Sequence, residues 1–360
     1  MLLENIQLIN FRSYKNLFVE LPEEGCLFFG ENGSGKTNFF EAAGVCVTGK
    51  SVRNASLREM ISVEEKETYV LANFIDDDGE KVSQSVGFSK NNEIFISIND
   101  LKYKNFSSLY GKSRFVYFGV DDVKTVTGIP QERRQFIDMT ISQTNGEYLQ
   151  NIIKYRNLVR QRNFIISEKF NENLIDVYDG QIAEIAVSII KERKNFFNEI
   201  TPVCEKIYEK ISNGDLSINL RYLPSIDCEN KEEYYKIQKE NLNRDREHKF
   251  TTTGIHRDNF EFRTANIKLM NFCSQGQCKS AAISLKVAVV QYLSKSNKKT
   301  IVVIDDAFSD LDISRKQNFF EILNKKGQIF IAVHSIKELD CYPLKNYFEI
   351  KEGNMKCFQK

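Results

Sequence analysis

Eight residues near the start of the chain have the spacing of a phosphate-binding loop. They read G-E-N-G-S-G-K-T and fit the pattern G-x-x-x-x-G-K-T. Glycines in such a loop let backbone N–H groups point at a phosphate, and the helix that follows adds partial positive charge. The lysine reaches the β- and γ-phosphates of a nucleotide, and the threonine hydroxyl binds Mg²⁺. The predicted site consists of Gly30, Glu31, Asn32, Gly33, Ser34, Gly35, Lys36 and Thr37.

Two adjacent acids follow a short apolar run in the segment T-I-V-V-I-D-D-A-F-S-D-L-D, residues 300–312. The run is typical of a buried strand, which places Asp305 at a strand tip where it can hold Mg²⁺ directly or through water. Asp306 follows at the position of a general base that faces the γ-phosphate. The alternative is that both acids only end a strand and begin a turn.

A third motif, F-C-S-Q-G-Q at residues 272–277, precedes a helical pattern. A turn of this type at a helix start exposes N–H groups and has a small residue for close approach of an anion. One γ-phosphate hardly needs two such sites, unless the second serves the nucleotide of another subunit. Taken alone, the motif leaves two alternatives: a plain helix cap, or an anion site formed by Ser274, Gly276 and Gln277 that serves the nucleotide of another subunit.

The elements around these motifs predict an α/β fold. Alternating and apolar runs predict strands before the glycine loop, apolar residues at helical spacing predict a helix after Thr37, and residues 68–98 read as an antiparallel meander. Helical patterns dominate from Pro130 to about Asn213, with Pro202 predicted to break or kink them. The nucleotide fold is therefore split, with an ATPase lobe at 1–106 and 247–360 and a mainly helical lobe at 107–246.

Composition narrows the class of protein. The 360 residues are 41% hydrophobic and 28% charged, as in a folded globular chain, and 50 Lys and Arg nearly balance 49 Asp and Glu. A nucleic-acid site must therefore be a local patch. The eight cysteines form no C-x-x-C pair and read as reduced thiols. No stretch approaches the ~20 apolar residues of a membrane span, so we expect a cytoplasmic protein without a membrane role.

The ordered set of glycine loop, S-Q-G-Q turn and Asp-Asp strand resembles the ABC-type ATPases. Further segments, in the same order along nearly the whole chain, are similar to the SMC-like RecF family of that group: N-F-R-S-Y (10–14), residues 114–138, Y-R-N-L-V-R-Q-R-N (155–163) and T-G-I-H-R-D-N-F-E-F (253–262). The chain departs from the family pattern at Val120-Asp121, at Ile255 and at Cys278-Lys279.

The resemblance implies an ABC-type ATPase head with a mainly helical second lobe inserted, and ATP and Mg²⁺ as cofactors. Two heads close on two ATP molecules, so that the S-Q-G-Q turn meets the partner's γ-phosphate and Ser309, Asp310 and Asp312 line the seam. Such proteins bind duplex DNA near single-strand gaps, work with RecO and RecR and help RecA to load, in DNA repair, replication and the SOS response. The resemblance implies a weak, DNA-stimulated ATPase rather than a metabolic enzyme.

Smaller signals suggest further site residues. Lys154, Arg156, Arg160 and Arg162 form a basic run without acids, which predicts either a DNA-backbone contact or a solvated helix face. Arg12 is a candidate nucleotide contact, with a surface arginine as the alternative. His334 follows a predicted strand at the place of a γ-phosphate sensor, with a polar residue at a strand end as the alternative. The segment His256-Arg257-Asp258 matches the family without a physical role that the sequence reveals.

Two other functions share some of these motifs. The nucleotide-binding subunit of an ABC transporter would have the glycine loop, the turn and the acidic strand, but the interval from Thr37 to Phe272 is far longer than such a subunit has. A simple P-loop kinase or GTPase leaves the S-Q-G-Q turn and the segment S-D-L-D unexplained. The leading hypothesis is an ATP-dependent DNA-binding repair protein in which hydrolysis times release.

Overall fold

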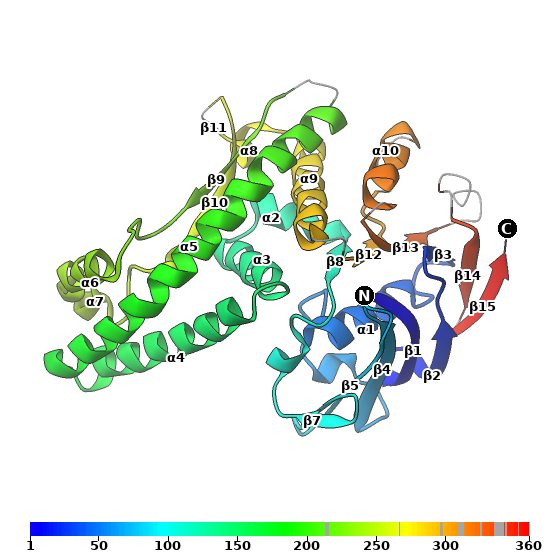
Figure 1. Ribbon diagram of the computed structural model, residues 1–360, viewed down its shortest axis with the longest axis horizontal. Coiled ribbons are helices and arrows are strands. Elements are labelled where there is room, and N and C mark those ends of the chain that lie inside the picture. Colours follow the sequence, from blue (N-terminus) through cyan, green and yellow to red (C-terminus); the bar gives the residue numbers. More distant parts are fainter. Residues whose placement is uncertain are drawn as a thin grey trace. The chain divides into compact units, whose positions relative to one another are not determined.

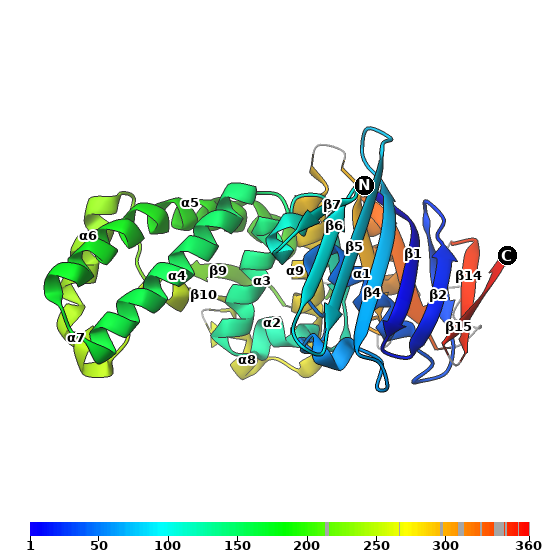
Figure 2. The ribbon, with the colours of Figure 1, turned by 90° about the horizontal axis from the view of Figure 1, so that it is seen from below.

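The computed structural model, shown in Figures 1 and 2, contains two compact units, which we describe separately. The first unit joins residues 1–122 to 289–360, and the second comprises residues 123–288. The structure describes residues 1–212, 216–265, 267–295, 298–308, 313–324, 326–334, 342, 344–351 and 353–359.

A mixed sheet carries the functional edge of the first unit. Its strand order is β15-β14-β3-β13-β12-β8, and all neighbours are parallel except β14 and β15. Because β3 and β12 run in the same direction, their carboxyl ends lie at one edge of the sheet, where Asp305 ends β12 and the glycine loop follows β3. The strands are β3 (Gly25–Phe29), β8 (Phe115–Phe118), β12 (Thr300–Asp305), β13 (Gly327–Val333), β14 (Asn346–Lys351) and β15 (Asn354–Gln359).

An antiparallel sheet of order β2-β1-β4-β5-β6-β7 forms the other layer of this unit (Figure 2). Helix α1 (Lys36–Thr48) contacts strands of both sheets, and apolar side chains of both layers form one core around it. The glycine loop is thereby anchored at the centre of the unit. The strands are β1 (Leu2–Phe11), β2 (Tyr14–Glu20), β4 (Glu67–Ile75), β5 (Lys81–Ser89), β6 (Ile94–Ile98) and β7 (Leu101–Tyr103); α10 spans Ile313–Asn324.

The second unit is built on two long helices that run side by side, α4 (Gly146–Glu168) and α5 (Glu172–Ile211), visible in Figure 1. Helix α5 continues through Pro202, so the predicted break there is wrong, while the alternative of a kink stays a prediction; buried Ile200, Cys204 and Ile207 hold the helix in place on both sides. A small antiparallel sheet packs on α5 and has the order β11-β10-β9.

The remaining elements complete the two units. The strands of the small sheet are β9 (Asn219–Leu223), β10 (Asn259–Thr264) and β11 (Ile267–Lys268). Short 3₁₀ turns lie at Arg58–Met60, Phe106–Leu109, Val120–Val123 and Ile255–Arg257. The other helices are α2 (Lys124–Thr127), α3 (Pro130–Ser142), α6 (Lys231–Glu240), α7 (Leu242–His248), α8 (Leu269–Phe272) and α9 (Gln275–Leu293).

The boundaries between the units differ from the predicted ones at 106/107 and 246/247. Residues 107–122 belong to the first unit, because β8 pairs with β12. Residues 247–288 belong to the second unit, because β10 pairs with β9. Both boundaries differ from the predicted ones because strands pair with segments that are distant in sequence. Helical periodicity alone does not reveal such pairing.

Two expectations from composition concern the chain as a whole. Every cysteine in the described ranges is a free thiol, while Cys341 lies outside them. None of the helices in those ranges is both long enough and apolar enough to span a bilayer.

Candidate nucleotide site and nucleic-acid surface

The glycine loop connects the end of β3 to the start of α1 and is shaped by close backbone contacts. Gly35 has a φ of +119°, and a Cβ added there would lie 2.8 Å from the hydroxyl oxygen of Tyr14. That hydroxyl donates a hydrogen bond of 3.0 Å to the Gly35 carbonyl. Only glycine satisfies both the left-handed backbone and the approach of the tyrosine, so Gly35 sets the direction in which α1 begins.

The start of α1 leaves polar groups for a ligand. The helix has no side-chain cap and no acid in its first turn, so its positive end is not neutralised locally. The Lys36 ammonium group folds over the loop and donates to the carbonyls of Gly30 (2.5 Å) and Glu31 (3.1 Å). The Ser34 Oγ atom is buried and has no hydrogen-bond partner within the described residues. This arrangement suits the phosphates of a nucleotide.

Asp305 presents one carboxylate oxygen beside the loop. Tyr117 on β8 donates a hydrogen bond of 2.8 Å to Oδ2, whereas Oδ1 is buried and has no hydrogen-bond partner in the part of the chain that the structure describes. Burial raises the pKa of Asp305, and the nearby Thr37 and Tyr117 side chains oppose that rise. A buried, unpartnered carboxylate oxygen near a threonine hydroxyl is a donor set that Mg²⁺ prefers. The residues present therefore fit the predicted cation.

The structure brings together two predicted catalytic residues. Oδ1 of Asp306 lies 3.0 Å from Nε2 of His334. Asp306 has a φ of +56°, a left-handed conformation that is uncommon outside glycine and clusters at functional sites. The sequence placed each residue at a strand end, and the parallel pairing of β12 with β13 makes the two ends neighbours.

Arg12 is engaged by a buried acid of α1. Its guanidinium group donates to both carboxylate oxygens of Glu41, at 2.8 and 3.2 Å, and to the carbonyl of Glu59. Arg53 and Ser51 also donate to Glu41. Burial alone would raise the pKa of Glu41, but the hydrogen bonds from these groups hold it below the usual range. Arg12 thus anchors α1, and its contact with a nucleotide stays a prediction.

The S-Q-G-Q turn, in the second unit, is a capping box. The Cys278 N–H donates to the Ser274 carbonyl, which makes Ser274 the N-cap of α9. The Gln277 N–H donates to Ser274 Oγ (3.2 Å), and the Ser274 N–H donates to Gln277 Oε1 (2.9 Å). Ser274 and Gly276 remain exposed. The predicted helix cap is therefore present, and the exposed side of the turn is still available to a ligand.

Asp310 lies outside the described residues, as do Ser309 and Asp312.

Arg162 does not face solvent, so the prediction of a DNA contact at this position is wrong. Its side chain is fully buried and donates to Asp179 (2.6 Å) and Asp245 (2.7 Å), with a further bond of 2.8 Å to the Thr251 hydroxyl. Position 162 falls on the face of α4 that carries Leu158, Val159 and Ile165, where two carboxylates offset the cost of burying its charge.

The other three residues of the basic run are exposed: Lys154, Arg156 and Arg160. Nη2 of Arg156 lies 2.8 Å from Oδ2 of Asp138, and its side chain stays 53% exposed. These residues leave a positive face on α4 that a phosphate backbone can approach.

Two further arginines of the second unit lie near each other outside α4, and the periodicity of α4 gave no sign of them. Arg134 on α3 donates to the carbonyl of Asp258. Burial lowers its pKa, and the charges of Arg193 and Arg257 lower it further. Arg257 is exposed and lies over the ring of Phe250, 4.9 Å from its centroid. The family-like segments around Arg134 and Arg257 thus meet in one place.

The segment His256-Arg257-Asp258 has a structural role inside the second unit. Asp258 is buried and accepts from Arg193 (2.6 Å), the Ser225 N–H (2.8 Å) and the Tyr222 hydroxyl. His256 contacts the Tyr155 hydroxyl through Nδ1 and the Thr251 carbonyl through Nε2. Burial lowers the pKa of His256 to about 4, which keeps this imidazole neutral at physiological pH.

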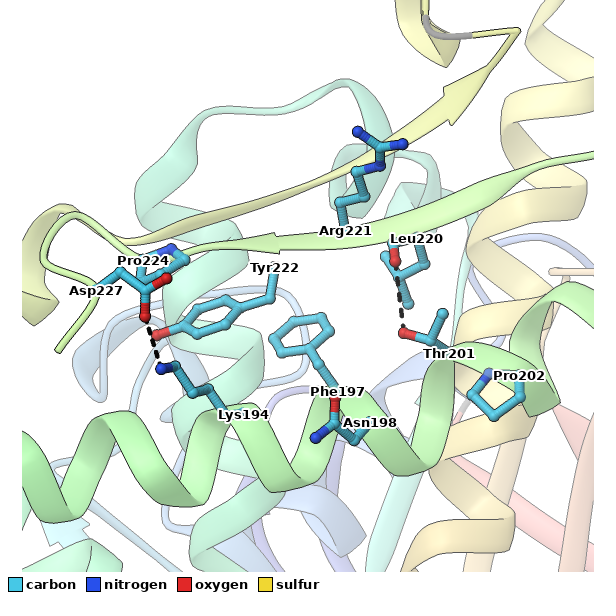
Figure 3. Close-up of a pocket in the computed structure, with 10 residues that line it drawn as sticks. All are labelled: Lys194, Phe197, Asn198, Thr201, Pro202, Leu220, Arg221, Tyr222, Pro224 and Asp227. Carbon is cyan, nitrogen blue, oxygen red and sulfur yellow. Dashed lines mark hydrogen bonds and ion pairs between the residues drawn. The ribbon is translucent and has the colours of Figure 1, made fainter. Parts of the chain in front are cut away.

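A groove of about 430 Å³ lies between α5 and β9 (Figure 3). The rings of Phe197 and Tyr222 stack on its wall with centroids 4.9 Å apart, and Lys194 pairs with Asp227 at 2.6 Å. None of the residues that line it belongs to the three predicted motifs. It is therefore separate from the candidate nucleotide site.

Comparison with known proteins places this arrangement in a family. The family model described as RecF/RecN/SMC N terminal domain matches residues 2–351. "DNA replication and repair protein RecF" of Clostridium beijerinckii is 32% identical over 347 residues, which cover 95% of this chain and 94% of that protein. The protein of the same description from Clostridium botulinum strain Langeland is 32% identical over 349 residues, which cover 95% of each chain.

Solved structures show the same fold. The structure described as the recombination mediator protein RecF-ATP in the RecFOR pathway has a TM-score of 0.91 and 26% identity, covering 99% of this chain and 97% of that one. An Smc head bound to the C-winged helix domain of ScpA has a TM-score of 0.58 at 16% identity, with 100% and 98% covered, and supports the fold alone. The predicted fold class, an ABC-type ATPase head with a mainly helical second lobe, is confirmed, and the chain belongs to the RecF family within the RecF/RecN/SMC group.

Proposed function

We propose that this chain is an ATP-dependent DNA-binding protein of recombinational repair and replication-gap processing. The observation that carries the proposal is the buried, unpartnered Oδ1 of Asp305 near Thr37, at the loop that holds Lys36. The relatives named RecF support the repair role, and the RecF structure described with ATP supports the nucleotide.

In this proposal, residues of the first unit bind the phosphates of ATP, hold the cation and activate the attacking water. Lys36 and the loop N–H groups would bind the phosphates, and Thr37 and Asp305 would hold Mg²⁺, which would supply positive charge to offset that of the phosphates. Asp306 orients the attacking water and accepts its proton, and its contact with His334 fixes the direction of its carboxylate. The expected result is slow hydrolysis that acts as a timer.

The S-Q-G-Q turn serves the nucleotide of a second copy in the proposed dimer. The capping box keeps Ser274 and Gly276 in a fixed turn, and both are exposed, as a contact with another subunit requires. We include Asp310 in the same seam. Binding of ATP then closes two heads on each other, and hydrolysis reopens them.

The proposed DNA surface lies on the second unit. Lys154, Arg156 and Arg160 on α4 would contact the backbone of duplex DNA near single-strand gaps, and Arg134 and Arg257 are further candidates for such contacts. Such contacts supply sequence-independent affinity, which suits a protein that recognises gaps rather than a base sequence. RecR and RecO would be its partners in the cytoplasm, and RecA would be loaded onto the DNA as a result.

A transport subunit is disfavoured, because the family match extends through the interval from Thr37 to Phe272.

The change Arg156→Ala with Arg160→Ala should weaken binding to gapped duplex DNA and make it less sensitive to salt. Each lost phosphate contact lowers the slope of log K against log salt by about 0.9, so the pair should lower it by about 2. Fluorescence anisotropy of labelled DNA over a range of salt concentrations measures the slope. Asp138 keeps Arg193 as its partner in this variant, so the fold should be preserved.

A matched control removes two exposed lysines of α6, Lys231→Ala with Lys236→Ala, in the same unit. Both variants lose the same net charge. A loss of DNA affinity that depends on total charge should therefore occur in both, whereas a loss that comes from local contacts of Arg156 and Arg160 should occur only in the first. An unchanged slope in the Arg156 and Arg160 variant would remove α4 from the DNA surface.

A further inference from the structure

Tyr117 lies next to the acid that we assign to Mg²⁺. It belongs to β8, which pairs in parallel with β12 so that Tyr117 is opposite Val303, two residues before Asp305. From this position its hydroxyl reaches along the neighbouring strand and donates a hydrogen bond of 2.8 Å to Oδ2 of Asp305. The pairing of the two strands thus determines which residue touches the carboxylate.

This hydrogen bond makes the two oxygens of Asp305 unequal. Oδ2 has a donor, whereas Oδ1 is buried and has no hydrogen-bond partner within the described residues. A carboxylate held in this way offers one oxygen to a cation. Mg²⁺ is bound through single oxygens in near-octahedral geometry, whereas Ca²⁺ also accepts both oxygens of one carboxylate.

Gly119 provides the space that the tyrosine ring needs. A Cβ added at Gly119 would lie 2.5 Å from Cε1 of Tyr117 and 3.0 Å from its hydroxyl oxygen. Carbon atoms do not approach so closely, so any side chain at position 119 displaces the ring. The glycine two residues after Tyr117 is therefore part of the same arrangement.

We propose that Tyr117 is a positioning residue that fixes Asp305 for one-oxygen binding of Mg²⁺, and that Gly119 keeps its ring in place. The inference rests on the proposed function, since it concerns the cation that accompanies the nucleotide. It assigns a role to a strand that carries none of the three motifs, and it predicts selectivity for Mg²⁺ over larger cations. Hydrogen bonds from neighbouring groups orient metal ligands in this way in other sites.

The test is a cation titration of nucleotide binding by the full chain. Fluorescent ATP is held constant while Mg²⁺ or Ca²⁺ is added to wild type and to Tyr117→Phe. Loss of a hydrogen bond to a charged group should raise the Mg²⁺ concentration for half-saturation by roughly tenfold. The Ca²⁺ concentration for half-saturation of Tyr117→Phe should stay within about twofold of the wild-type value, because the freed carboxylate can bind Ca²⁺ with both oxygens. Binding in EDTA should be unchanged.

Two further variants separate positioning from general damage. Gly119→Ala should shift the Mg²⁺ titration in the same direction and tests the inference if Tyr117→Phe does not fold. Tyr347→Phe, which removes a tyrosine hydroxyl from β14 in the same unit, should leave both titrations unchanged. If Mg²⁺ dependence is the same in wild type, Tyr117→Phe and Gly119→Ala, the inference is overturned while the proposed function stands. If wild type shows no Mg²⁺-dependent nucleotide binding, both are overturned.

Discussion

Lys36→Ala should reduce the affinity for ATP by roughly 10- to 100-fold, because it removes a charged donor from the phosphates. In the structure this ammonium group is held over the loop by the carbonyls of Gly30 and Glu31, so it is already near the place where phosphates would lie. Titration with fluorescent ATP in the presence of Mg²⁺ measures the loss.

Lys15→Ala on β2 is the matched control, since it removes an exposed lysine from the same unit. We expect its ATP affinity to equal that of wild type. Equal affinity in wild type and Lys36→Ala would show that the glycine loop does not hold the triphosphate.

Arg193→Met should destabilise the second unit by about 3 to 5 kcal/mol, the usual result of removing one partner from a buried ion pair. The Arg193 side chain is 2% exposed and donates to Asp138 (2.7 Å) and Asp258 (2.6 Å). It also donates to the Tyr148 hydroxyl and to the carbonyl of Ile255. Its removal leaves the buried Asp258 without its ion-pair partner and leaves Asp138 with Arg156 alone. Urea unfolding followed by circular dichroism measures the change.

Lys194→Met supplies the comparison one position further along α5. Lys194 pairs with Asp227 at 2.6 Å, but their side chains are 36% and 70% exposed, so the expected change is within about 1 kcal/mol. Similar unfolding midpoints for the Arg193 and Lys194 variants would show that the buried network contributes little.

The motifs that bind a nucleotide could be predicted because their chemistry is local. The glycine loop is read from consecutive residues, and the apolar run before Asp305 indicates a strand whose tip must lie at the carboxyl edge of the sheet. The alternation in residues 68–98 predicted strands β4, β5 and β6 for the same reason. Motif order then pointed to the family.

The rest depends on contacts between residues that are distant in sequence. Arg162 reads as part of a basic run, but its partners Asp179 and Asp245 lie 17 and 83 residues away and are invisible to local patterns. Tyr117 gains its role only when β8 pairs with β12. The capping box of Ser274 and Gln277 is different, because the spacing S-x-x-Q is itself a helix-start signal that was available in the sequence.

The central claim is that ATP joins two copies of this chain, and light scattering of the Asp306→Asn variant tests it most directly. Asparagine cannot accept the proton of water, so ATP should remain bound and the dimer should persist. Mg²⁺ and ATP should therefore double the mass of Asp306→Asn, while Lys36→Ala stays at the mass of one chain under the same conditions. A single-chain mass for Asp306→Asn at saturating ATP would contradict the account.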